Sequence, residues 1–247
     1  MRLQKQLYWV GSGDMGLSLT HPQDCNVYVI DYGQGLAMVD AGVGLDVEGI
    51  ERQMAADGLN PANLTHLLLT HGHADHMGGA AYFKEKYHLR VLAPAAEADY
   101  IATADGSMLG LTVALAAGYY PKGYVLTPCA VDHRVSAGDS FELGGDIRVA
   151  AYEASGHSIG GVCYHVTLEN RHVLFTGDLI CHGGKISLQN IPGANVHNYS
   201  RSVLALESVD VDLLAPGHHC PSLNRGKIHI DAACEAFRKL GIPQNVV

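Results

Sequence analysis

Three histidines and an aspartate fall within six residues of this sequence: His71, His73, Asp75 and His76. The apolar run 67–69 before them is typical of a buried strand, and residues 80–87 after them are typical of a helix. The cluster is therefore expected on a tight loop at a strand end, where Gly72 relaxes the backbone because it lacks a Cβ. Neutral imidazole and carboxylate groups suit zinc. The spacing thus predicts a metal site.

The order His71-x-His73-x-Asp75-His76 resembles the motif of the metallo-β-lactamase-fold hydrolases, a family that includes glyoxalase II, lactonases and RNase Z. The resemblance extends over nearly the whole chain, because later ligand positions recur in the family's order. It implies an α/β fold, namely a four-layer αβ/βα sandwich that forms a single domain over residues 1–247. The metal site is then expected at one edge of the sandwich.

The resemblance also implies the remaining metal ligands, each at a later strand end. A first metal is expected on His71, His73 and His157, and a second on Asp75, His76 and His218. Asp178 matches the bridging aspartate of the family. The implied cofactors are two divalent metal ions, with Zn²⁺ expected first and Fe or Mn as alternatives. Asp40 matches an aspartate that supports the metal loop in the family.

Two metal ions at roughly 3.5–4 Å can share a hydroxide, and zinc lowers the pKa of bound water to about 7. A nucleophile is then available at neutral pH without a Ser-His-Asp triad. Asp75 is the candidate catalytic residue, because it binds metal and can also orient the nucleophile or accept its proton. We therefore predict a dinuclear metal hydrolase, lactonase-like or thioesterase-like, that cleaves an ester, lactone or thioester bond.

Two alternatives within the same fold stay open. β-Lactam hydrolysis is one, although Asp178 disfavours a class of β-lactamase that lacks a bridging carboxylate. The other is a persulfide dioxygenase, which would use one iron on positions that match His71, His157 and Asp178. Glutathione specificity is doubtful, because the stretch after Asp178 reads 181–185 Cys-His-Gly-Gly-Lys and offers only Lys185 as a cation.

The segment at about 97–130 is apolar and long for a connection between strands, which favours an apolar lid insertion. Its tyrosines could donate a hydrogen bond to a developing oxyanion. Packing against the body or a dimer contact is the open alternative. Five residues are candidate substrate contacts: Tyr119, Tyr124, His182, Lys185 and His219.

The composition, 47% apolar and 17% charged over 247 residues, is that of a soluble globular protein. A net charge of −9 argues against a nucleic-acid partner, which would need a basic face. Residues 1–10 lack a signal core, and no apolar run is long enough to span a bilayer. Six scattered cysteines favour reduced thiols. We expect a cytoplasmic protein with a small-molecule substrate, no membrane partner and a homodimer as an option.

Two of the cysteines, Cys181 and Cys220, lie within three residues of proposed ligands and could line the site. The remaining pattern alternates strands and helices. Strands are expected at 3–10, 26–31, 36–40, 67–69, 89–93, 162–166, 172–176 and 211–215, with a hairpin over 133–152. Helices are expected at 46–57, 80–87, 95–105, 199–207 and 229–240. The stretch 153–161 resembles the first metal loop, which suggests two related halves.

Overall fold

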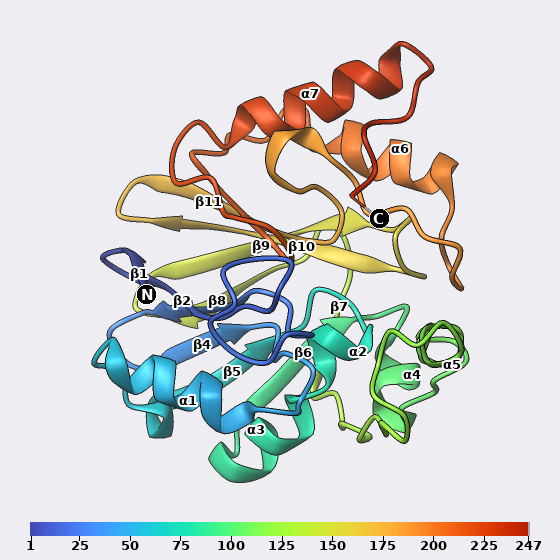
Figure 1. The fold of residues 1–247 in the computed structure, drawn as a ribbon. Coiled ribbons are helices and arrows are strands. Elements are labelled where there is room, and N and C mark those ends of the chain that lie inside the picture. Colours follow the sequence, from blue (N-terminus) through green and yellow to red (C-terminus); the bar gives the residue numbers. More distant parts are fainter. Residues whose placement is uncertain (247) are drawn as a thin grey trace.

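The computed structural model describes residues 1–246 and contains two β-sheets that face each other (Figure 1). The larger sheet has seven strands in sequence order: β1 (Arg2–Gln4), β2 (Leu7–Gly11), β3 (Val27–Asp31), β4 (Leu36–Val39), β5 (Leu64–Leu68), β6 (Arg90–Pro94) and β7 (His133–Val135). The smaller sheet has the order β12-β11-β10-β9-β8. Its strands are β8 (Ser140–Gly144), β9 (Ile147–Ala154), β10 (Gly161–Leu168), β11 (Arg171–Gly177) and β12 (Leu213–Pro216).

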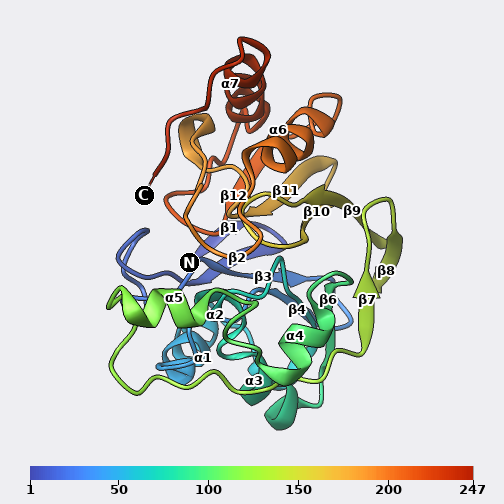
Figure 2. The same cartoon turned by 90° about the vertical axis from the view of Figure 1, so that its right-hand side faces the viewer.

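Helices cover the outer face of each sheet (Figures 1 and 2). α1 (Val47–Ala56) and α3 (Ala80–Tyr87) lie on the larger sheet, whereas α6 (Val196–Ala205) and α7 (Lys227–Arg238) lie on the smaller one. Three short helices complete the chain: α2 (Ala74–Met77), α4 (Ala98–Thr103) and α5 (Leu111–Ala116). The predicted four-layer αβ/βα sandwich is therefore confirmed.

Three apolar layers hold the sandwich together. The central layer lies between the sheets and contains large side chains such as Trp9, Tyr28, Tyr164 and Phe175. A second layer packs α1 and α3 against the larger sheet, and a third packs α6 and α7 against the smaller one. On α7 the buried positions recur at helical spacing, namely Ile230, Ala233, Cys234 and Phe237. This spacing gives the helix one apolar stripe toward the sheet.

Strand direction places the metal-binding loops at one edge. Strands β4 to β7 are parallel, so their carboxyl ends meet at the same side of the larger sheet. In the smaller sheet β11 and β12 are also parallel, and Gly177 pairs with Pro216. Asp178 and His218 follow these two paired positions within two residues. The topology thus brings residues that are 40 positions apart in sequence next to each other.

Two sequence predictions about local structure were wrong. Residues 3–10 form two strands, β1 and β2, which pair with each other because the chain turns at Lys5 and Gln6. Only β8 and β9 form a hairpin within 133–152, because β7 pairs with β6 in the other sheet. His229, the first residue of the helix expected at 229–240, lies buried on α7, where its Nδ1 accepts from the Gly183 amide at 3.0 Å.

Within residues 1–246, every helix is too short or too polar to cross a membrane.

Candidate metal centre

Seven side chains that can bind metal gather where four strands end. The loop after β5 carries His71, His73, Asp75 and His76, and the loop after β9 carries His157. Asp178 follows β11 and His218 follows β12. All seven are buried, and none exposes more than 9% of its surface. The structure therefore brings together every ligand that the resemblance implies.

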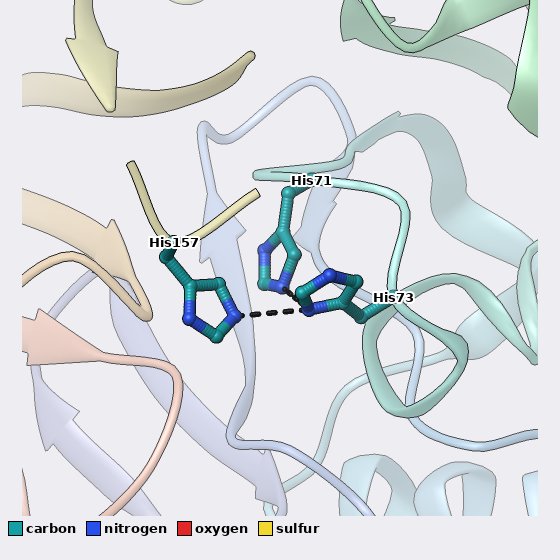
Figure 3. A group of neighbouring side chains, drawn as sticks. All are labelled: His71, His73 and His157. Carbon is teal, nitrogen blue, oxygen red and sulfur yellow. Dashed lines mark hydrogen bonds between the residues drawn. The ribbon is translucent and has the colours of Figure 1, made fainter. Parts of the chain in front are cut away.

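Three imidazoles form the first cluster (Figure 3). His73 Nδ1 lies 3.0 Å from His71 Nε2 and 2.9 Å from His157 Nε2. His71 and His73 come from one loop, and His157 reaches them from the opposite side. Their nitrogens thus converge on one point between the two sheets.

The outer hydrogen bonds fix which ring nitrogens carry protons. His157 Nδ1 donates to the Ser187 carbonyl at 2.6 Å, because a carbonyl can only accept. Thr70 Oγ1 donates to Asp40 at 2.8 Å, so it accepts at 3.0 Å from His71 Nδ1. In the neutral form that binds metal, the Nε2 atoms of His71 and His157 therefore present lone pairs to His73. One imidazole proton cannot satisfy both, whereas a cation can.

Burial also keeps the rings of His71 and His73 neutral. It holds the pKa of His71 well below its ordinary value, and nearby His76 acts in the same direction. Burial together with His157 lowers the pKa of His73 to about 3. Neutral imidazole is the form that binds metal. Both rings are thus ready to act as ligands at neutral pH.

The second cluster adds carboxylates. Asp75 Oδ2 lies 3.0 Å from His218 Nε2 and 3.6 Å from His76 Nε2. Asp178 lies between the clusters, since its Oδ2 is 3.4 Å from both His157 Nε2 and His218 Nε2 and its Oδ1 is 3.3 Å from His76 Nε2. This arrangement is the one a bridging carboxylate requires. Burial alone would raise the pKa of Asp178, but the neighbouring imidazoles hold it well below its ordinary value.

Two buried atoms in this cluster lack a hydrogen-bond partner among the described residues. They are His76 Nε2 and Asp178 Oδ1, and they face the same space. Buried polar atoms are normally satisfied, so an orphaned pair calls for an explanation. His76 Nδ1 contacts Asp40 Oδ2 at 2.9 Å, which directs Nε2 away from Asp40 and into this space. The donor set therefore fits divalent cations.

Asp40 supports both clusters, in agreement with its expected supporting role. Besides the bonds to Thr70 Oγ1 and His76, its Oδ1 accepts from the Thr70 amide at 2.8 Å. One carboxylate thus orients His76 directly and His71 through Thr70. Cys25 is also close, since Cys25, Asp40 and His76 bring potential donor atoms within 4.8 Å of one another. Neither Cys181 nor Cys220 belongs to such a group among residues 1–246.

Gly72 is needed for a different reason from the one predicted. Its φ lies outside the left-handed region, so backbone freedom is not the issue. A Cβ at this position would lie 2.6 Å from Leu109 Cδ2 and 3.1 Å from Glu97 Oε2. Close approach of the 97–130 segment therefore explains the glycine.

A cavity of about 270 Å³ opens above the two clusters. His73, Asp75, His157, Asp178 and His218 form part of its lining. Its apolar wall comes largely from the segment 97–130: Leu109, Leu111, Val113, Ala114 and Ala117. Met15 and Ile191 complete this wall. Of the lining residues that the structure describes, none is Lys or Arg.

Tyr120 lines the cavity but was not among the five predicted substrate contacts. Its hydroxyl donates to Asp75 Oδ1 at 3.0 Å, on the opposite side of the carboxylate from His218. Burial, with the negative charge of Asp75, raises the pKa of Tyr120, so the phenol stays a proton donor. Glu97, which is 1% exposed, was missed as well. The only signal for Glu97 in the sequence was its position at the start of the predicted insertion.

The predicted substrate contacts separate into two groups. Tyr119 lines the cavity and is 46% exposed. Tyr124, His182, Lys185 and His219 do not line it. The Tyr124 hydroxyl instead donates to the Val43 carbonyl at 2.8 Å, and the His182 ring packs at 4.4 Å from that of His229. For these four residues the structure offers no contact with the cavity.

Two facing sheets with outer helices and buried clusters of histidine and aspartate at one edge define a metal-binding αβ/βα sandwich. The model of the Metallo-beta-lactamase superfamily matches residues 21–218, and the chain belongs to this superfamily. The resemblance inferred from the motif at 71–76 is thereby confirmed. The clustered histidine and aspartate ligands at the edge of this fold suit divalent metal ions.

The individual proteins that resemble this chain share about a quarter to a third of its residues over the matched region. The chain is 31% identical over 117 residues to a hydroxyacylglutathione hydrolase of Rhizobium meliloti, a match that covers 47% of this chain and 34% of that protein. It is 26% identical over 233 residues to an atrochrysone carboxyl ACP thioesterase of Pseudocercospora fijiensis, covering 89% and 58%. The chain thus spans less than two thirds of the length of these relatives.

Among solved structures, a subclass B3 metallo-β-lactamase of Bradyrhizobium japonicum superposes with a TM-score of 0.72 at 22% identity. The match covers 97% of this chain and 92% of that one. A metallo-β-lactamase of Cronobacter sakazakii gives a TM-score of 0.67 at 24% identity, covering 86% and 75%. At these identities the likeness establishes the shared fold.

Proposed function

We propose that this protein is a dinuclear metal hydrolase that cleaves a thioester, ester or lactone bond in a small substrate with an apolar part. The observation that carries the proposal is the position of the ligand clusters at the floor of an apolar cavity. A substrate in this cavity would place its scissile bond against Asp75, Asp178 and His218. Binding cavities usually combine apolar walls with a few polar groups.

Two divalent ions, when bound, would supply an activated water at neutral pH and polarise the substrate carbonyl. His71, His73 and His157 would hold one ion, and Asp75, His76 and His218 the other, with Asp178 shared. Among the chain's own groups, Asp75 lies at the ligand cluster, where it could accept the proton of the nucleophile. Its Oδ2 faces the ligand atoms, while its Oδ1 is held by the Tyr120 hydroxyl. This orientation suits a carboxylate that positions the nucleophile.

The cavity wall favours a neutral, apolar group beside the scissile bond. Burying an anion without a partner is costly, and no cation occurs among the described lining residues. The carboxylates of glutathione or of a β-lactam antibiotic would therefore find no cationic side chain on this wall, and only the metal ions at the floor could offset their charge. Lys185, the one basic candidate from the sequence, lies outside this lining.

The relatives' names support the choice of bond. Both the hydroxyacylglutathione hydrolase and the ACP thioesterase are named for thioester hydrolysis. We therefore rank a thioester first, ahead of esters and lactones. The β-lactamase structures support β-lactam hydrolysis only through the shared fold.

Two divalent ions per chain are expected in protein purified without chelator. The expectation follows from the two clusters, because a single ion in the first cluster would leave His76 Nε2 and Asp178 Oδ1 without a partner. Elemental analysis of the purified protein measures the stoichiometry. One iron per chain, together with oxygen consumption on a persulfide, would instead favour the dioxygenase alternative and sink this proposal.

Hydrolysis of acyl thioesters that share one thiol should become more efficient with acyl length. Each methylene buried in an apolar cavity contributes about 0.8 kcal/mol, so kcat/KM should rise roughly fourfold per methylene until the cavity is full. A dicarboxylic acyl thioester of matched length is the control, and it should be a poor substrate. A preference for this anionic control would contradict the proposed substrate class.

A further inference from the structure

Glu97 is a buried acid outside the ligand set, at the residue that precedes α4. It is 1% exposed, and both of its oxygens accept hydrogen bonds. Oε2 accepts from the Gly72 amide at 2.6 Å. Oε1 accepts from Ser158 Oγ at 2.6 Å and from the Gly160 amide at 2.8 Å.

These partners belong to the two loops that build the first cluster. Gly72 lies between His71 and His73, and Ser158 follows His157 directly. One carboxylate therefore joins the two loops whose imidazole nitrogens converge at 2.9–3.0 Å. The three bonds to Glu97 are 2.6–2.8 Å long, and charged acceptors form stronger hydrogen bonds than neutral ones.

The two loops are also joined by a second connection, at their bases, in addition to the Glu97 bonds. The Val162 amide donates to the Thr70 carbonyl at 2.8 Å, where the strands that carry the loops meet. A single connection would leave the loops free to pivot about it. The Glu97 bonds lie beyond Thr70 and Val162, toward the loop tips, and fix the remaining freedom.

The backbone around Glu97 is also fitted to this contact. A Cβ on Gly160 would lie 2.4 Å from Ala96 Cβ, and one on Gly72 would lie 3.1 Å from Glu97 Oε2. Both loops thus approach the start of the 97–130 segment more closely than residues with larger side chains would allow. The contact is therefore specific to these glycines and this acid.

We infer that Glu97 is a positioning residue for the first metal cluster: it holds the 71–73 loop and the 157–160 loop at the separation that lets His71, His73 and His157 bind one ion. The inference rests on the proposed function only in that the cluster binds metal. Partners behind metal ligands commonly change metal affinity by about 10–100-fold when they are removed.

Glu97→Gln tests this role without a change in size. An amide nitrogen in place of one oxygen cannot accept, so it leaves at least one of the loop donors unpaired. We expect the affinity for one of the two Zn²⁺ ions to fall at least tenfold, as measured by competition with a chromophoric chelator. The melting temperature of the metal-free protein provides the second readout. A fold-only role would lower that temperature and leave the affinity unchanged.

Glu153→Gln is the matched control. Glu153 lies on β9, ahead of His157, and its Oε1 accepts from Ser155 Oγ at 2.7 Å, but its side chain is 41% exposed and contacts only one of the loops. The Glu153→Gln protein should bind Zn²⁺ with the same affinity as the parent protein. Ser158→Ala removes a single Glu97 bond and should give an intermediate loss, which keeps the inference testable if Glu97→Gln fails to fold.

Equal Zn²⁺ affinity in the parent, Glu97→Gln and Ser158→Ala proteins would overturn the inference. So would an equal loss in Glu97→Gln and Glu153→Gln, because that would reflect loss of charge alone. A parent protein that binds no Zn²⁺ would instead refute the proposed function. The chelator titration therefore separates the two failures without any substrate.

Discussion

Replacing Asp178 with alanine is expected to lower kcat by roughly a thousandfold. Metal ions contribute several kcal/mol to stabilising a transition state, and each 1.36 kcal/mol corresponds to a factor of ten. Asp178 is the one ligand whose oxygens face both clusters, within 3.3–3.4 Å of His76, His157 and His218. Its loss should thus release one ion or weaken both. Steady-state kinetics on the best thioester, with metal content measured on the same sample, tests this.

His76→Ala should behave in the same way, since it removes the other atom of the orphaned pair. The exposed Asp210 offers a control, because Asp210→Ala removes a carboxylate outside the ligand set and should leave kcat unchanged. Circular dichroism must show that the variants remain folded, as lost metal binding also lowers stability. Near-normal turnover of Asp178→Ala with a full metal complement would contradict the proposed mechanism.

The sequence predicted the metal loop well because its ligands are local. Four ligand types within six residues indicate a site before any tertiary contact is known. The remaining ligands, His157, Asp178 and His218, could be assigned only through the family resemblance, because parallel pairing of β11 with β12 is what brings the last two together. The four-layer sandwich was accessible in the same way and is confirmed.

The sequence could not predict which side chains of the 97–130 segment face the metal. Residues 117–130 form no helix or strand, so no period assigns their side chains to one face. Tyr119 and Tyr124 were chosen as substrate contacts, yet the residue that contacts Asp75 is Tyr120. Glu97 gave no stronger signal, since its partners lie in two distant loops. Whether the segment moves as a lid remains a prediction, although it forms much of the cavity wall.

The sequence also failed to predict which residues near the later ligands reach the cavity. The candidates were His182, Lys185 and His219. They follow Asp178 and His218 closely in sequence, which made them candidates. The chain turns away after each ligand, however, and His219 adopts φ 62° while its carbonyl accepts from Asn26. Proximity in sequence to a ligand therefore does not predict proximity to the cavity.

Tyr120→Phe is expected to lower kcat by roughly 10–100-fold with little change in KM, an effect typical of groups behind a metal ligand. The substitution removes only the hydroxyl that donates to Asp75 Oδ1, so Asp75 loses the bond that fixes its rotation. The phenyl ring still fills the cavity wall and still packs on Tyr124, whose ring centroid is 5.1 Å away. Steady-state kinetics with a Zn²⁺ titration tests this. A lower kcat at unchanged KM would indicate that the loss of activity comes from Asp75, whereas a higher KM would indicate weaker substrate binding.

Tyr124→Phe is the matched control for this prediction. Its hydroxyl donates to the Val43 carbonyl, outside the cavity, so its loss should leave kcat and KM within about twofold of the parent. Equal losses in both variants would mean that the tyrosines act by packing the segment. An unchanged kcat in Tyr120→Phe would show that Asp75 keeps its orientation without the phenol, because His218 and the bound ion would then suffice. Only a selective loss in Tyr120→Phe makes the 97–130 segment part of the catalytic centre as well as its wall.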